Sequence, residues 1–230
     1  MTTNMNQKIK SMSYLAGRKR RIFSMVGMGV ALIFIILLAT SIGSVSIPVG
    51  TTASILVDKL PGIDIQQTWS DTSATIVLDI RLPRIILAGL VGAALAIAGA
   101  TYQGLFRNPL ADPYLIGVAQ GASLGAVIGF LMPMAWNVAA FGAIPVFAFI
   151  GAIVSTTIVY LLARRGKTLP VTTLILAGVA LSALLSSVVS YLVIFSGSKL
   201  HSIIFWLMGS FSGAQWSEVL VVLPYVVVGT

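Results

Sequence analysis

The residues best suited to chemistry in this sequence are two arginines, Arg81 and Arg84, which flank Leu82 and Pro83. A guanidinium group forms paired hydrogen bonds with a carboxylate, so two of them three positions apart could bind an acidic partner. The alternative is that both side chains lie at a membrane surface and pair with Asp79. Position in the sequence does not decide between docking and local pairing.

Other reactive groups are few. The sequence has no cysteine, which excludes disulfides, thiolate metal sites and cysteine nucleophiles. Its single histidine, His201, argues against a cluster of metal ligands and suits an interfacial position better. Because no nucleophile–base pair can be recognised, we expect no catalytic residue, no metal site and no cofactor.

One short motif resembles part of a nucleotide site. Gly166-Lys167-Thr168 matches the end of a phosphate-binding loop, but that loop also needs a glycine where Leu161 stands and a strand before it. An apolar helix is expected there instead. If the protein uses ATP, we expect another chain to bind it.

The elements that hold these residues are strongly apolar. Hydrophobic residues make up 57% of the chain and charged residues 9%, whereas soluble domains contain about 25% charged residues. We therefore predict an all-α integral membrane protein, a polytopic bundle of transmembrane helices. The net charge of +8 gathers at the ends of hydrophobic runs, as topology signals do, so no nucleic-acid partner is expected.

About six membrane-spanning helices are expected after a basic cytoplasmic tail at residues 1–21, which would also meet membrane lipid. The spans lie approximately at residues 22–42, 84–105, 114–131, 144–163, 172–195 and from 219 onward. A short external helix is expected between Ser46 and Pro61. The sixth span stops at Thr230, so residues 22–230 are interpreted as a transmembrane domain that is incomplete at its C-terminus.

Small residues recur at every fourth position on the second and third spans. In water each such glycine would weaken a helix by about 1 kcal/mol, whereas in lipid small residues let helix backbones approach closely. We expect a helix-packing role for Gly92, Gly117, Gly121 and Gly125. Between these spans Asn108-Pro109 ends one helix, and Asp112 with Pro113 begins the next.

The distribution of charge sets the orientation. Ten of the 14 Lys and Arg residues fall on the side of the basic tail, so the N-terminus is expected in the cytoplasm, and Arg81 and Arg84 are external exceptions. Apart from Arg84 at the start of the second span, no Asp, Glu, Lys, Arg or His falls within the proposed spans, whereas proton- or sodium-coupled carriers usually need one inside the membrane. An ion-coupled secondary transporter remains the alternative.

Seven segments carry a family resemblance. They are Arg81-Leu-Pro-Arg84, Gly92 to Gly99, Gln103 to Pro113, Leu115 to Val118, Gly121-Ala122, Leu176 to Leu181 and Phe205 to Gly209. In order and spacing they closely resemble the FecCD-type permeases, the membrane subunits of ATP-binding-cassette importers for iron-siderophores, haem and vitamin B12. The resemblance covers most of residues 76–218.

The resemblance implies about ten membrane helices in a complete subunit, in the cytoplasmic membrane of a bacterium. It implies a second permease subunit, identical or homologous, two cytoplasmic ATPase subunits and an extracytoplasmic substrate-binding protein. The expected substrate is a ferric siderophore or a related metal chelate. The family's ATPase-coupling loop would follow Thr230, so we do not expect this chain alone to transport.

The resemblance also assigns residues. Arg81 and Arg84 would dock the substrate-binding protein through its acidic residues. The translocation pathway and its inner gate would include Val171 and Thr172, with Gly178, Ser182 and Ser186 along the wall. A simple helix-packing role is the alternative for the two serines.

Overall fold

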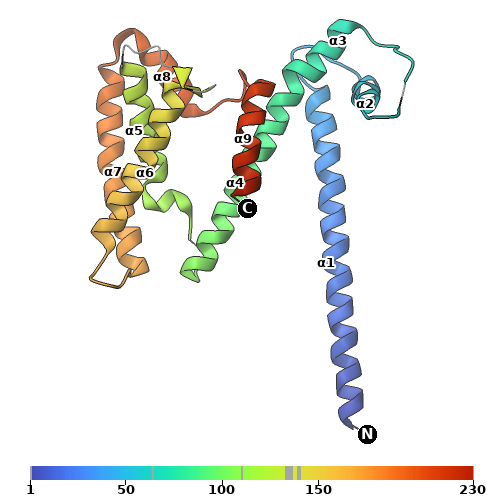
Figure 1. Ribbon diagram of the computed structural model, residues 1–230, viewed down its shortest axis with the longest axis horizontal. Helices are drawn as coiled ribbons and strands as arrows, with labels where there is room; N and C mark the ends of the chain where they lie inside the picture. The colour runs from blue at the N-terminus through green and yellow to red at the C-terminus, as the bar shows by residue number, and fades with distance from the viewer. Residues whose placement is uncertain (1, 64, 110, 133–136, 139–140, 230) are drawn as a thin grey trace. The chain divides into compact units, whose positions relative to one another are not determined.

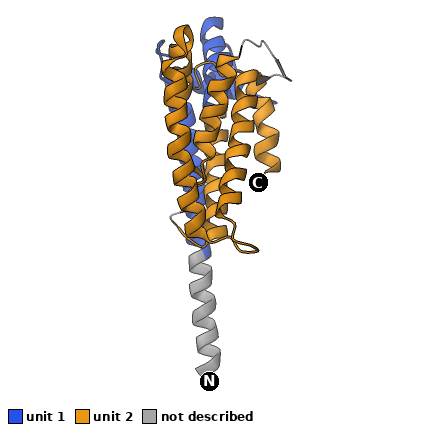
Figure 2. Cartoon of the chain, turned by 90° about the vertical axis from the view of Figure 1, so that its left-hand side faces the viewer, with its two compact units in different colours: residues 1–85 blue, residues 86–230 orange. Residues whose placement is uncertain are grey.

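The computed structural model describes the backbone of residues 2–63, 65–109, 111–132, 137–138 and 141–229, and the side chains of these except at 2–17, 115, 137–138 and 141. The fold is all-α, as predicted. Its only strands in the described part are a two-residue pair, β1 (Asn137–Val138) and β2 (Phe141–Gly142). The chain divides into two compact units, residues 1–85 and 86–230 (Figure 2).

The first unit is built on one long helix, α1 (Thr2–Ser41), followed by α2 (Val49–Asp58). The short helix α3 (Asp71–Thr75) begins at Ser70, whose side chain accepts a hydrogen bond from the backbone N–H of Ser73. It continues into η1 (Ile76–Arg81), a π-helix, and then into α4 (Leu82–Phe106). A small core of Ile47, Ile55 and Val77 holds α2, α3 and η1 together.

The second unit centres on three packed helices, α5 (Val118–Leu131), α6 (Ala143–Ala163) and α7 (Val171–Ile194), which stand side by side in Figure 1. The 3-10 turn η2 (Pro113–Ile116) leads into α5, and η3 (Gly197–Lys199) leads into α8 (Leu200–Met208). The last helix is α9 (Trp216–Val228).

The start of α5 shows why the chain turns where it does. The Asp112 side chain accepts a hydrogen bond from Tyr114 N–H at 2.8 Å, and Pro113 takes the first position of η2, where no donor is needed. Gly117 follows in the left-handed region at φ +80°, which glycine adopts without steric cost. The predicted third span, 114–131, is therefore two elements that meet at Gly117.

Four helical segments of the described chain are long and apolar enough to cross a membrane: Arg18–Ser41, Asp71–Phe106, Ala143–Ala163 and Val171–Ile194. Three helices are apolar but shorter: Val49–Asp58, Val118–Leu131 and Trp216–Val228. The second predicted span is thus longer than expected at its N-terminal end, because α3, η1 and α4 form one continuous helical segment. The predicted boundary at residues 21 and 22 lies inside α1, and most of the turn expected at 132–142 lies outside the described residues.

Candidate functional site

Arg81 is held inside the first unit by the end of α1. Its Nη1 donates to the backbone carbonyl oxygens of Thr40 at 2.8 Å and Ser41 at 2.9 Å, and its Nη2 donates to the carbonyl oxygen of Val45. The residue is 8% exposed. The guanidinium therefore binds three carbonyl groups of a segment that lies 36 to 41 positions earlier in the sequence.

The last turn of α1 favours this arrangement. The last carbonyl groups of a helix have no partner within the helix and carry partial negative charge, so a cation there is stabilising. Thr40 and Ser41 are both buried, and each places its own hydroxyl on a carbonyl one turn back, Ile36 and Leu37 respectively. The Thr40 and Ser41 carbonyl oxygens accept from the arginine, and that of Ser41 also accepts from Ile47 N–H at 3.5 Å.

Arg84 has a different environment. It is half-buried, and its Nε atom is buried without a hydrogen-bond partner among the described residues. Asp79 is exposed, and the one ion pair in the described side chains joins Lys59 to Asp58 at 3.4 Å. The structure therefore shows no ion pair between Asp79 and either arginine.

These findings bear on the predicted docking pair. The structure gives Arg81 three carbonyl partners inside the chain and gives the buried Nε atom of Arg84 none. Docking of an acidic partner stays a prediction for both residues. Docking by Arg81 would require its guanidinium group to break its hydrogen bonds to three carbonyl oxygens.

A junction of small residues forms in the second unit where η2, α5, α6 and α7 meet. Ser155 donates from Oγ to the carbonyl oxygen of Gly117 at 2.9 Å. A Cβ placed on Gly117 would lie 3.5 Å from Val159, 3.7 Å from Ser182 Oγ and 3.9 Å from the Gly178 carbonyl oxygen. The structure thus brings together two of the predicted wall positions with one of the predicted packing glycines.

The closest helix contact in this unit lies between α5 and α6. A Cβ on Gly121 would collide with the Gly151 carbonyl oxygen and Ser155, and one on Gly125 would collide with the Phe147 carbonyl oxygen. The two backbones touch because no side chain stands between them, which is how small residues pack helices in lipid. Gly92, by contrast, has no described atom within 4 Å of its Cβ position.

The other predicted pathway residues lie along α7. Thr172 and Ser186 are exposed, and Val171 is half-buried at the first position of the helix. Ser186 accepts a hydrogen bond from Ser190 through its backbone carbonyl. The five residues are therefore spread along one helix, with only Gly178 and Ser182 at the small-residue junction.

Lys199 makes a long-range contact that was not predicted from the sequence. Its Nζ atom donates to the carbonyl oxygen of Phe130 in the last turn of α5, at 2.6 Å. It brings the start of α8 onto α5, and Ile203 of α8 packs in a buried cluster with Val127 and Val189. The sequence did contain one signal for this contact. Lys199 is one of the few basic residues on the predicted external side, and a basic residue there needs a local partner.

The loop between α6 and α7 is a tight turn and holds no phosphate-binding fold. Arg165 and Thr168 exchange backbone hydrogen bonds at 3.0 Å, with Gly166 at φ +60° between them. The element before it is the helix α6, as expected. His201 is exposed on α8, and no group of His, Asp and Glu residues that could hold a metal ion occurs in the described chain.

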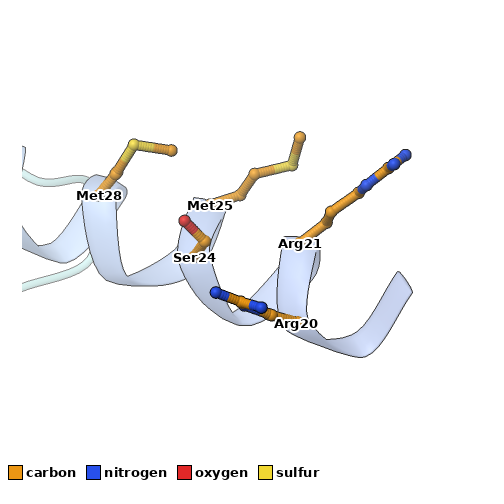
Figure 3. A pocket seen from close by; sticks show the side chains of 5 residues that line it. All are labelled: Arg20, Arg21, Ser24, Met25 and Met28. Atoms are coloured by element: carbon orange, nitrogen blue, oxygen red, sulfur yellow. The ribbon is translucent and has the colours of Figure 1, made fainter. Parts of the chain in front are cut away.

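Exposed basic residues lie midway along α1. Arg20, Arg21, Ser24, Met25 and Met28 are all exposed and line a shallow hollow on its surface, as Figure 3 shows. Basic residues directly before an apolar run suit the headgroup region of an anionic membrane leaflet.

Comparison with known proteins decides the family. The model of the FecCD transport family matches residues 31–230. The chain belongs to the FecCD transport family. Its members are ABC transporter permeases, which are membrane subunits without enzymatic activity of their own, and the chain is accordingly a multi-pass membrane protein.

Individual FecCD relatives agree with this placement. The chain is 36% identical over 232 residues to the cobalamin import system permease protein BtuC of Halobacterium salinarum, which covers 88% of this chain and 62% of that protein. It is 42% identical over 160 residues to the hemin transport system permease protein HmuU of Yersinia pestis, covering 66% of this chain and 47% of the relative. The chain thus spans about half to three fifths of the length of these curated relatives.

A solved structure has the same fold. It is an inward-facing conformation of a protein assigned to the metal-chelate type of ABC transporter. The TM-score is 0.64 at 30% sequence identity, and the match covers 85% of this chain and 56% of the other.

Proposed function

We propose that this chain is part of the membrane-spanning permease subunit of an ATP-binding-cassette importer that moves a ferric siderophore or a related metal chelate into the cell. The observation that carries the proposal is the FecCD match over residues 31–230. Two relatives are named for cobalamin and hemin, and both compounds are large organic chelates of a metal ion. A ferric siderophore is a large organic metal chelate as well.

The described spans fit a passage for such a bulky ligand. Beyond Arg84, none of α4, α5, α6 and α7 contains an Asp, Glu, Lys, Arg or His residue. An intramembrane ionisable group would mark the pathway of a proton- or ion-coupled carrier. We therefore favour ATP over an ion gradient as the energy source, and the ATPase is a separate subunit in this proposal.

The partners follow from the same proposal. A second permease subunit, identical or homologous, completes the passage, two ATPase subunits lie on the cytoplasmic side with the N-terminus, and a substrate-binding protein delivers the chelate from outside. The membrane is the cytoplasmic membrane of a bacterium. Alternating access, driven by ATP binding in the partner subunits, would move the helices around the substrate.

Two sets of residues serve this function in the proposal. Arg84, which forms no hydrogen bond or ion pair with the described residues, is the better candidate to meet an acidic residue of the binding protein. The pathway would run along α7 past Val171, Thr172, Gly178, Ser182 and Ser186. For Gly178 and Ser182 the contacts with Gly117 support a packing role beside the pathway role.

Reconstituted uptake tests the proposal. The full-length permease, its ATPase and its binding protein are placed in proteoliposomes and offered ferrichrome, hemin or cyanocobalamin. We expect accumulation of one of these chelates only when ATP is present on the ATPase side. Accumulation driven by a proton or sodium gradient without the ATPase would replace the importer by the ion-coupled alternative.

A further inference from the structure

The two arginines of the docking element differ in what they can bind. Arg81 directs both terminal nitrogens at the carbonyl oxygens of Thr40, Ser41 and Val45, while Arg84 has no described partner for its Nε atom. We propose that Arg81 is a positioning residue, which fastens the start of α4 to the end of α1 so that Arg84 alone meets the acidic partner. The second half of this statement rests on the proposed docking function.

The contacts of Arg81 make it a poor docking group. A carboxylate of a partner could bind this guanidinium only after its hydrogen bonds to the carbonyl groups had broken. Thr40 and Ser41 are buried residues, and a buried acceptor that loses its donor is costly; the Ser41 carbonyl oxygen would keep only the Ile47 N–H at 3.5 Å. A partner therefore gains little from Arg81, whereas Arg84 is half-buried and forms no hydrogen bond or ion pair with the described residues.

The backbone between the two residues supports a positioning role. η1 is a π-helix that ends at Arg81, and Leu82 N–H bonds to the carbonyl oxygen of Val77, five residues back. Single π-helical turns of this kind are rare and concentrate at functional sites. Arg84 stands three residues after Arg81 on the continuing helix, so fixing the guanidinium of Arg81 also fixes the turn that presents Arg84.

Gly43 belongs to the same arrangement. A Cβ atom at this position would lie 2.5 Å from Nη2 and 2.8 Å from Cζ of Arg81. Gly43 has an ordinary φ, so space and not backbone conformation requires the glycine. The substitution Gly43→Ala therefore disturbs the hold on Arg81 without changing either arginine, and Gly50→Ala, with nothing within 4 Å, is its control.

Chemical modification tests the hold on Arg81. The full-length permease in lipid nanodiscs is treated with phenylglyoxal, which reacts with free guanidinium groups, and the products are read by mass spectrometry. We expect Arg81 to react at least about tenfold more slowly than Arg84, because reaction needs local opening. Gly43→Ala should bring the rate at Arg81 towards that at Arg84, and Gly50→Ala should not. Equal rates in the unaltered protein would refute the proposal.

A double-mutant cycle tests the positioning role, with the binding protein of the same transport system as the probe. Arg84→Gln should weaken association, and Arg81→Gln should weaken it as well. Because Arg81 acts through Arg84, it should have no further effect once Arg84 is replaced. Additive effects would make Arg81 an independent docking residue and overturn the inference.

Two further outcomes distinguish the hold of α1 on Arg81 from docking by Arg84. Should Arg81→Gln fail to fold, Gly43→Ala takes its place in the cycle, with the same non-additive result expected. Should neither arginine affect association, docking by Arg84 is refuted, and with it the positioning role. The phenylglyoxal rates would still decide whether Arg81 is held by the end of α1.

Discussion

Ser155 of α6 donates a hydrogen bond from its Oγ atom to the backbone carbonyl oxygen of Gly117, 2.9 Å away on the neighbouring segment. Ser155 is 3% exposed, and the same hydroxyl also lies 3.0 Å from the carbonyl oxygen of Ala152 in its own helix. Gly117 is the left-handed residue between η2 and α5. At Gly117 the chain changes from a 3-10 helix to an α-helix. The hydrogen bond thus links this residue to the middle of α6.

Replacing Ser155 by alanine tests the strength of this tie. We expect Ser155→Ala to lower the stability of the purified protein by about 1 kcal/mol, because a buried carbonyl loses its side-chain donor. Thr157→Ala is the matched control, since Thr157 is a residue of the same helix whose hydroxyl is exposed and bonds only to Ile153 in its own helix. Thermal unfolding in detergent measures both. Equal effects would show that the bond to Gly117 is unimportant.

Gly125 tests the direct contact of α5 with α6. In Gly125→Ala the new methyl group meets the carbonyl group of Phe147 and lies 3.1 Å from the Cα atom of Ala148, and backbone atoms cannot rotate away. Overpacking of this kind costs about 1–3 kcal/mol. Gly89→Ala in α4 meets no described atom within 4 Å and should be neutral. A lower midpoint of thermal unfolding for Gly125→Ala alone is the expected result.

Lys199 is expected to stabilise the end of α5. Lys199→Met keeps the apolar stem but removes the charge from the Phe130 carbonyl group, which should cost about 1 kcal/mol. Hydrogen exchange at the last turn of α5 should become faster. Lys59→Met, at a side chain that is 62% exposed, is the control and should change neither quantity. Unchanged exchange in Lys199→Met would mean that α8 is held by its apolar contacts alone.

Much of the fold could be predicted from local sequence patterns. The spans predicted at 144–163 and 172–195 agree with α6 and α7 to within one residue at each end, because an apolar run there stops at Arg164 and resumes after Pro170. The short helix expected after Ser46 is α2. Such boundaries depend on residues that are neighbours in the sequence, so a single chain is enough to place them.

The contacts of the candidate site could not be predicted in this way. Arg81 and Lys199 bind carbonyl groups that are 36 or more positions away in the sequence. Every residue has a backbone carbonyl group, so the residue types do not reveal which one is the partner. The distribution of Lys and Arg residues could show that an external arginine needs an explanation. It could not show which carbonyl group accepts the hydrogen bonds of that arginine. Similarly, four-residue glycine spacing suggests a packing face without naming the helix that lies against it.

Ser186 tests the proposed pathway along α7. Its side chain is exposed, so Ser186→Trp should fold normally yet reduce ATP-dependent chelate uptake at least about tenfold by filling the passage. Ser187→Trp changes the next residue, which is also exposed but points in another direction around the helix. Normal uptake by Ser186→Trp, with normal folding, would remove this residue from the pathway.

The orientation of the chain can be read from the turn between α6 and α7. The sequence has no cysteine, so a single Cys introduced at Lys167 or at Lys59 is a unique reporter, and both positions are exposed. Lys residues of the tail and the turn are expected on the cytoplasmic side. A maleimide that cannot cross membranes should therefore label Lys59→Cys but not Lys167→Cys in intact cells, and should label both after the membrane is opened. Labelling of Lys167→Cys from outside would show that the orientation is the opposite of the one predicted. Arg84 would then face the cytosol, where no extracytoplasmic binding protein could reach it.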